Sequence, residues 1–295
     1  MTEFKEETGP VVDLNLGSSG KILASKQDKI ALIDADTVIF AACVVCEYLE
    51  ETDVGIGEVK WEEVYKIDLD EAYDAAMAKI QEILDLTGCS DFELHFTSGR
   101  ESFRYTRVDE EYKANRNGLR VPVGIKDLKE YFVDKFPTKA FNWTEFEADD
   151  VVVSKKLKFP ELYELCAVDK DVRFAIVGKH FNYFKREDIG REMRYEEVEA
   201  DTVLKHFYMQ TLTGDKGDNV IGLSGIGPKK AEKILDGKNT HKELWEAVVE
   251  AYEAKGRCVT DAIKNMRLVN MYQVKFIGDN PNENKFEVVL WKPEK

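Results

Sequence analysis

The sequence predicts an α/β protein built on a mostly parallel sheet, and two observations lead to this fold class. Short apolar runs that end at acidic residues alternate with helix-like segments up to about residue 200, and the pattern then becomes mainly helical. The chain has 295 residues, of which 43% are hydrophobic, so it can bury a sizeable core. In such sheets ligands bind outside the carboxyl ends of the strands, so we expect the functional site of this chain at that edge.

The first elements follow from periodicity. Residues 1–28 are polar and lack periodicity, so we expect a loose tail. The run KIALIDADTVIF from Lys29 predicts a buried strand that stops at acidic residues and passes into a helix reaching Tyr48. A helix is predicted over 68–86, a strand over 91–98 and a helix over 123–136.

The later elements complete the core and begin a second unit. A helix is predicted over 146–157, a strand over 164–168, and two further strands over 173–178 and 180–186. These segments place a core domain at 29–200 and a second, helical module at 201–295.

Composition excludes several classes of protein. No run of about 18 apolar residues exists to span a membrane, and the N-terminus lacks a signal peptide, so we expect a cytoplasmic protein without membrane contact. Five cysteines fit no disulfide framework, and the isolated Cys43-x-x-Cys46 favours core packing over zinc binding. The net charge of −15 opposes a broad DNA-binding surface, so any contact with DNA must be local.

Carboxylates gather at the predicted strand ends and helix starts. Any single one among the 57 acidic residues is more often solvated or a helix cap than catalytic. Crowded carboxylates without a cation are unfavourable, however, and their oxygens are the ligands that Mg²⁺ prefers. The four places are Asp34; Glu147, Asp149 and Asp150; Asp169 and Asp171; and Asp215 and Asp218.

A glycine-rich hairpin follows the last acidic pair. Gly225 and Gly227 permit a tight turn in which backbone N–H groups approach a phosphate, and Pro228 suits the first turn of a helix. That helix begins with the lysines Lys229, Lys230 and Lys233. The pattern is typical of a helix-hairpin-helix, and an ordinary glycine-rich turn between helices is the alternative.

Residues 100–120 interleave basic and aromatic side chains. The stretch holds six Lys or Arg and four Asp or Glu, a net of +2, together with Phe103, Tyr105 and Tyr112. Such a combination occurs in single-strand channels, where bases stack on rings and cations meet phosphates. A solvated amphipathic helix explains the stretch equally well, and both interpretations stay open.

Five motifs occur in an order that resembles the 5′-nuclease family, in its branch of phage 5′→3′ exonucleases and flap endonucleases. They are IDADT, EYKANR, EFEADD, VDKD and GDKGDNVIGLSGIGPKKA. The resemblance runs from Lys29 to the C-terminal LWKP. It implies a PIN-like (resolvase-like) core and a helical arch at about 99–125, and single strands would pass through this arch or beneath it. It also implies a helix-three-turn-helix module at 201–295 that binds duplex DNA.

The resemblance also implies roles for single residues. Asp34, Glu147, Asp149 and Asp150 would hold the tighter of two Mg²⁺ ions, for which Mn²⁺ can substitute, and Asp169, Asp171, Asp215 and Asp218 the second. Lys113 and Arg116 would contact the scissile phosphate, Tyr112 would stack on a base, and backbone oxygens of Gly225 and Gly227 would bind K⁺. Ser98 stands where the family usually has an aspartate, which removes one charge from the first site.

The expected function is therefore Mg²⁺-dependent hydrolysis of DNA near 5′ ends, flaps or nicks, leaving 5′-phosphates. RNA–DNA hybrids are a further substrate class, a monomer is expected, and a phage-encoded protein would act in the host cytoplasm during DNA replication or degradation. Two alternatives stay open. DADTV also fits the motif of a haloacid-dehalogenase-type Mg²⁺ phosphatase, and Ser98 favours a DNA-binding protein whose catalytic site has decayed.

Overall fold

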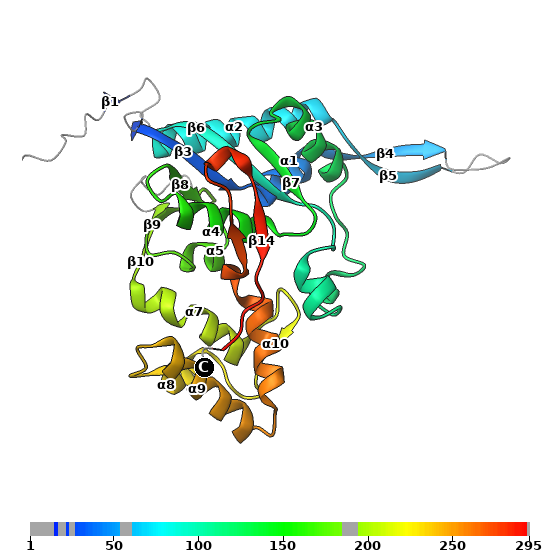
Figure 1. Cartoon of the computed structure of the whole chain (residues 1–295). Coiled ribbons are helices and arrows are strands. Elements are labelled where there is room, and N and C mark those ends of the chain that lie inside the picture. The colour runs from blue at the N-terminus through cyan, green and yellow to red at the C-terminus, as the bar shows by residue number, and fades with distance from the viewer. Residues whose placement is uncertain (1–14, 17–21, 24–26, 54–60, 185–193, 294–295) are drawn as a thin grey trace, which may run out of the picture.

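A computed structural model describes residues 15–16, 22–23, 27–53, 61–184 and 194–293 (Figure 1). Most of the expected tail, residues 1–28, lies outside these ranges; within it, β1 (Asn15–Leu16) pairs antiparallel with β2 (Ile22–Leu23). None of the helices in the described ranges is long and apolar enough to cross a membrane.

A six-stranded sheet forms the centre of the fold. Its order is β10-β9-β8-β3-β6-β7, and all neighbours run parallel except β10, which lies antiparallel to β9. The α/β class with a mostly parallel sheet is thereby confirmed. The strands are β3 (Gln27–Asp34), β6 (Cys89–Thr97), β7 (Ala140–Trp143), β8 (Tyr163–Cys166), β9 (Gly178–Phe181) and β10 (Tyr195–Val198).

Helices cover both faces of this sheet because its central strand is apolar on both sides. In β3, Ala31 and Ile33 pack with one hydrophobic cluster and Leu32 with the other, and all three are fully buried. The first cluster includes residues of α1 (Asp36–Cys46), α2 (Leu69–Thr87) and α3 (Ile125–Lys135). The second includes residues of α4 (Ala148–Lys158), α5 (Lys170–Phe174), α7 (Ala200–Thr213), α8 (Pro228–Leu235), α9 (His241–Ala254) and α10 (Val259–Val269).

The C-terminal helices share their core with the sheet. Leu165 of β8 belongs to the same buried cluster as Phe207 of α7, Leu244 of α9 and Met266 of α10. These helices lie side by side at one end of the molecule (Figure 1). The domain boundary at about residue 200 stays a prediction, but the two parts are joined by one continuous hydrophobic core.

Most of the predicted elements are confirmed, but one of the predicted strands is wrong. Residues 173–178 were expected to form a strand, but Arg173 and Phe174 end the short helix α5. That helix begins there because the side chain of Asp169 accepts a hydrogen bond from the backbone N–H of Asp171, which is the contact of a helix N-cap. The strand predicted at 180–186 is displaced and becomes β9, which begins at Gly178.

A two-stranded arm was not predicted. The helix expected to reach Tyr48 ends at Cys46, and β4 (Glu47–Asp53) and β5 (Trp61–Ile67) pair antiparallel. This arm projects away from the sheet (Figure 1). Its strands are rich in glutamate, which is disfavoured in strands, so propensity gave no signal for it.

The segment expected to be a helical arch is not a continuous helix. Within 99–125 the structure has a π-helical turn, η1 (Arg104–Val108), and a 3₁₀ turn, η2 (Ala114–Arg116), joined by turns. Lys113 has a left-handed backbone with φ 57°, and Gly118 has φ 78°. Residues with positive φ interrupt an α-helix, so the helical expectation for the arch is wrong in this conformation.

Two glycines hold the acidic loop 215–218 close to the end of α7. The loop lies between β11 (Gly214–Asp215) and β12 (Val220–Ile221), which pair antiparallel. A Cβ on Gly214 would lie 2.3 Å from the backbone N of Gly222, and a Cβ on Gly222 would lie 2.2 Å from the backbone C of Thr213. Only glycine fits at these two positions. Beyond this loop the helix-hairpin-helix role of the module stays a prediction.

A buried ion-pair network joins the sheet to the C-terminal hairpin, β13 (Val274–Phe276) and β14 (Phe286–Val288). Lys155 of α4, fully buried, pairs with Glu93 of β6 and donates to the side-chain oxygen of Asn284 at 2.7 Å. Glu93 also accepts from Tyr163 at 2.9 Å and lies 2.8 Å from His95 Nε2. Each partner compensates the burial of another, so removing one leaves an unpaired charge.

We therefore expect Lys155→Ala to lower the free energy of unfolding by about 3–5 kcal/mol, because Glu93 would stay buried without its cation. Urea denaturation measures this loss. Lys158→Ala, at an exposed position in the same helix, should change stability by less than about 0.5 kcal/mol.

The double variant Glu93→Gln with Lys155→Met removes both charges and keeps an acceptor for Tyr163. It should be more stable than Lys155→Ala alone. Equal loss in the two variants would show that packing of the lysine stem, and not the unpaired charge, sets the cost.

Candidate functional site

Two adjoining cavities lie at the carboxyl edge of the sheet. Their volumes are about 310 and 500 Å³. The residues that line both are mainly acidic, and they come from three of the four acidic places singled out in the sequence. The shared residues are Arg116, Glu147, Asp149, Asp169 and Asp218.

Strand ends and helix starts position these carboxylates. Asp34 is the last residue of β3, and it lines the smaller cavity. Glu147 is the N-cap residue of α4 and Asp149 lies in its first turn, where the helix dipole favours negative charge. The hydroxyl of Thr97, at the end of β6, accepts a hydrogen bond from Ala148 N at 3.0 Å and so fixes α4 against the sheet.

Three of the carboxylates repel one another. Burial, followed by the charges of Asp36 and Asp169, raises the pKa of Asp34 to about 7. Burial, with Asp34 and Asp169, raises the pKa of Asp149 well above its ordinary value, and burial also raises the pKa of Asp169. Asp34 Oδ1 is buried without a hydrogen-bond partner in the described structure. Such a cluster is short of positive charge.

Asp150 does not share this cavity. Arg104 holds it with two hydrogen bonds, from Nη1 to Oδ2 at 2.5 Å and from Nη2 to Oδ1 at 2.7 Å, and both side chains are buried. Both carboxylate oxygens are therefore occupied by the guanidinium, which is at odds with a role as a metal ligand in this conformation. Arg104 was not singled out, because nothing in a basic-aromatic stretch shows which arginine is buried.

Cations of the expected arch enter the acidic cavity. Lys113 Nζ lies 2.6 Å from Glu147 Oε1 and 3.8 Å from Asp218 Oδ2. Burial alone would lower the pKa of Lys113, but Glu147 and Asp218 outweigh it and raise that pKa. Arg116 Nη2 donates to Asp218 Oδ1 at 2.6 Å. The backbone N–H of Lys113 donates to Asp218 O at 3.0 Å, which stabilises its left-handed conformation.

Tyr112 lies below these cations. Its hydroxyl, which has a single proton to donate, lies 2.8 Å from Asp218 Oδ2 and 3.0 Å from Glu147 Oε2, and the residue is only 4% exposed. The ring packs in the main hydrophobic cluster. A ring so placed offers no face to a base, so base stacking by Tyr112 does not fit this conformation.

Asp171 is held by helix α7. Gln210 Nε2 donates to Asp171 Oδ2 at 2.7 Å, and His206 Nε2 lies 3.2 Å from Asp171 Oδ1. His206 and Gln210 were not predicted, although two polar residues four apart on an otherwise apolar helix face were a usable signal. Asp215 Oδ1 accepts from the backbone N–H of Gly217 at 2.7 Å.

The lysines after the glycine hairpin lie away from the acidic cavities. Lys229, Lys230 and Lys233 are exposed on α8. Lys230 Nζ donates to the carbonyl oxygen of Gly225 at 2.8 Å, so a cation already contacts one of the oxygens expected to bind K⁺. Gly225 has φ 76°, the left-handed conformation that the predicted tight turn requires.

Asp36 lines the smaller cavity, and Ser98 follows Thr97, which also lines it. The backbone N–H of Ser98 donates to Trp143 O at 2.6 Å, and its neighbours Gly99 and Arg100 line the cavity. Asp36, at the start of α1, pairs with Lys129 at 2.6 Å. The position at which the family has an aspartate thus lies beside an arginine in this chain.

The donor set fits a divalent metal ion. Asp34, Asp149 and Asp169 supply hard oxygen atoms in one cavity, and burial together with neighbouring carboxylates raises their pKa values. Among the described residues no group of three acidic, histidine or cysteine side chains could hold a metal ion as it stands. Mg²⁺ commonly binds through one or two carboxylates, with water and substrate phosphate as the other ligands, so this arrangement does not exclude it.

The raised pKa of Asp34 predicts that the metal-free protein loses stability as pH rises from about 4 to about 7. Between the unfolded pKa of 3.8 and the folded pKa of about 7, the folded chain binds more protons, so raising pH favours unfolding. The full effect is roughly 4 kcal/mol. Melting temperatures in EDTA at several pH values measure it.

Asp34→Asn should flatten this profile, whereas Asp134→Asn, at an exposed position on α3, should leave it unchanged. A profile as steep in Asp34→Asn as in the wild type would exclude Asp34 as its cause.

Known proteins resemble the chain over part of its length. No family model matches the sequence. It is 30% identical to the DNA polymerase I of Deinococcus radiodurans over 138 residues, which are 45% of this chain and 14% of that protein. It is 29% identical to the flap endonuclease of Escherichia phage T5 over 116 residues, 38% of this chain and 39% of the relative. The chain thus spans well under half the length of these relatives.

Solved structures extend the comparison. The zinc-bound 5′-exonuclease of T5 matches with a TM-score of 0.54 and 16% identity, over 83% of this chain and 90% of the other. The bacteriophage T5 D15 flap endonuclease variant in a pseudo-enzyme-product complex with DNA and metal ions matches with a TM-score of 0.51 and 18% identity, over 68% and 81%. The chain therefore resembles the 5′ nucleases in sequence, as its motifs indicated, and it has their fold.

Proposed function

We propose that the chain is a divalent-metal-dependent 5′ nuclease that hydrolyses DNA near 5′ ends, flaps or nicks. The observation that supports this most is the cavity in which Asp34, Asp149 and Asp169 meet Lys113 and Arg116. Carboxylates without enough positive charge suit metal ions, and cations at the same point suit a phosphate. Two relatives are named a flap endonuclease and a 5′-exonuclease, the latter with divalent zinc ions bound.

The residues divide into two ligand groups and a phosphate contact. Asp34, Glu147 and Asp149 would hold one Mg²⁺ or Mn²⁺, and Asp169, Asp171, Asp215 and Asp218 the other, with Asp150 acting through Arg104. Divalent ions held there would supply the Lewis acidity that activates water and would stabilise charge at the leaving 3′ oxygen. Lys113 and Arg116 would exchange their present partners, Glu147 and Asp218, for oxygens of the scissile phosphate.

The C-terminal module would hold the duplex. Lys229, Lys230 and Lys233 lie on the exposed surface of α8, whose N-terminus follows Gly227. A helix N-terminus with nearby lysines binds phosphate. A K⁺ ion bound by the backbone oxygens of Gly225 and Gly227 would have to displace Lys230 Nζ from the Gly225 oxygen. The ion and the ammonium group would therefore compete for that oxygen.

The finer parts of the proposal follow the same resemblance. We place the protein in phage DNA replication or degradation, as a monomer in the host cytoplasm, with RNA–DNA hybrids as a further substrate class. The phosphatase alternative is not favoured, because Asp36, which it needs as an acid–base group, is paired with Lys129 at 2.6 Å. The decayed-site alternative predicts binding without cutting, and the experiment below distinguishes it.

We expect Asp149→Asn to lower cleavage of a 5′-labelled flap by at least about 100-fold, because it removes a charge that would hold the metal ion. Asp150→Asn should act differently. It breaks the buried pair with Arg104, so its main effect should be a loss of folding stability of about 3 kcal/mol.

Cleavage with Mg²⁺ and with EDTA, beside urea unfolding of each variant, separates the two effects. A wild-type protein that binds the flap but never cuts it would refute the nuclease and support the decayed site. Full activity in Asp149→Asn would refute the ligand assignment.

Lys113→Ala should lower kcat by roughly 100-fold or more while DNA affinity changes little, because one positioned cation stabilises charge that develops in the transition state. Single-turnover cleavage gives kcat, and fluorescence anisotropy with Ca²⁺ gives affinity. Lys126→Ala, an exposed lysine of α3, is the matched control. An equal loss of affinity and rate would assign Lys113 to binding alone.

A further inference from the structure

A third cavity, larger than the two at the acidic site, lies against other residues of α7 and α10. Its volume is about 740 Å³, within the usual range of ligand-binding cavities. Helix α7 lines it with Leu204 and Phe207, whereas Gln210 and Thr213 of the same helix line the acidic cavity. The two cavities are therefore lined by different residues of α7.

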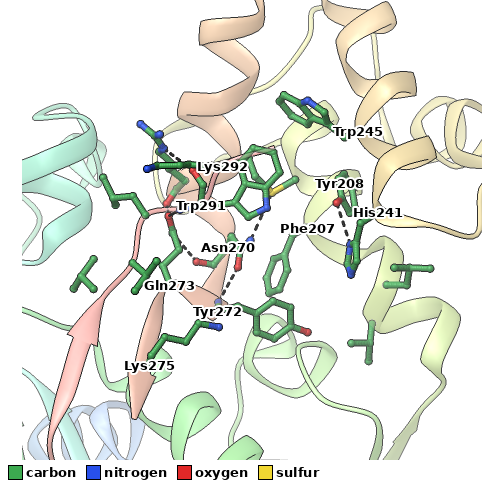
Figure 2. A pocket seen from close by; sticks show the side chains of 17 residues that line it. Phe207, Tyr208, His241, Trp245, Asn270, Tyr272, Gln273, Lys275, Trp291 and Lys292 are labelled. Carbon is green, nitrogen blue, oxygen red and sulfur yellow. Dashed lines mark hydrogen bonds between the residues drawn. The ribbon is translucent and has the colours of Figure 1, made fainter. Parts of the chain in front are cut away.

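The floor of this cavity is apolar and aromatic (Figure 2). Trp245 of α9 and Trp291 of the C-terminal segment meet edge to face, with ring centroids 4.7 Å apart. Phe207 and Tyr272 meet in the same way at 5.1 Å. Met266 and the aliphatic residues of α7 and β14 complete the walls. Such a surface accepts a large apolar group.

All the charged side chains that line the cavity, among the described residues, are basic. Arg267, Lys275 and Lys292 line it, and none of its 17 lining residues is Asp or Glu. None of these three cations forms an ion pair with another described residue, and Lys275 and Lys292 are exposed. In a chain of net charge −15, three unpaired cations around an apolar cavity favour an anionic occupant.

The amides in the floor are already used. Asn270 Oδ1 accepts from Tyr272 N at 2.7 Å. Gln273 donates to Arg267 O at 2.8 Å and accepts from Trp291 N at 2.9 Å (Figure 2). Reading a nucleobase requires free donors and acceptors at the base edge, and most of the polar atoms of these amides are already bonded within the chain. An aliphatic or aromatic side chain requires only the apolar floor.

We propose that this cavity binds an acidic peptide segment of a partner protein. A large apolar side chain of the peptide would enter between Trp245 and Leu204, and its carboxylates would pair with Arg267, Lys275 and Lys292. This surface lies outside the acidic site, so a partner could be bound there while the nuclease holds DNA. The inference does not depend on the proposed nuclease activity, and its test does not measure cleavage.

The test uses a panel of six fluorescein-labelled octapeptides, each with four Asp or Glu residues around one apolar residue: Phe, Leu, Ile, Met, Trp or Tyr. Anisotropy gives their affinity for the full chain, and quenching of tryptophan fluorescence reports contact with Trp245 and Trp291. We expect at least one peptide to bind with Kd on the order of 100 μM. Replacing its acids with Asn and Gln should weaken binding at least about tenfold.

The variant Lys275→Glu with Lys292→Glu should weaken the best peptide by at least about tenfold, because it reverses two of the three charges. Lys126→Glu with Lys179→Glu reverses two exposed charges elsewhere and should leave affinity unchanged. Unchanged melting temperatures show that both variants fold.

Three results would overturn the proposal. In the first, no peptide of the panel binds with a Kd below about 1 mM, which is roughly the weakest affinity that a specific contact gives. In the second, the neutral peptide binds as well as the acidic one. In the third, the double variant weakens binding of a labelled oligothymidylate and not of the peptides, which would assign the cavity to single-stranded nucleic acid.

Discussion

The buried guanidinium of Arg104 is the contact on which the geometry of the acidic site depends. It holds both oxygens of Asp150, approaches Glu147 at 3.2 Å, and donates to Leu268 O at 2.7 Å at the end of α10. One side chain thus fixes the base of the expected arch, the start of α4 and the C-terminal helices. Burial alone would lower the pKa of Arg104, but its carboxylate partners raise that pKa, so the charge is kept. Carboxylates so fixed do not have to be reordered when a ligand arrives.

Internal cations balance part of the negative charge in this conformation. Lys113 and Arg116 form ion pairs with Glu147 and Asp218, whereas neither Asp34 nor Asp149 forms an ion pair within the described residues. The site therefore has two halves with different electrostatics. One is closed by lysine and arginine, and the other is short of positive charge. A bound metal ion and a phosphate would change both halves, since the phosphate competes for the same cations.

The sequence predicted the parts of this fold that depend on local pattern. The apolar run ending at Asp34, the helix after Glu147 and the acidic loop 215–218 were recognised because burial and chemistry leave a periodic or positional signal. Residues whose role depends on distant partners were not found. Arg104 pairs with Asp150, 46 residues away, and the ring of Tyr112 is buried by helices that follow much later. No pattern within residues 100–120 distinguishes a buried arginine from a solvated one.

The glycines at 214 and 222 restrict how this chain could diversify. With no room for a methyl group at either position, the backbone around the acidic loop cannot be shifted by substitution there without separating it from α7. Because α7 also forms one wall of the aromatic cavity, a shift of the loop would disturb both faces of that helix. Substitutions of exposed loop side chains such as Lys216 leave this main chain in place, whereas a Cβ at either glycine does not.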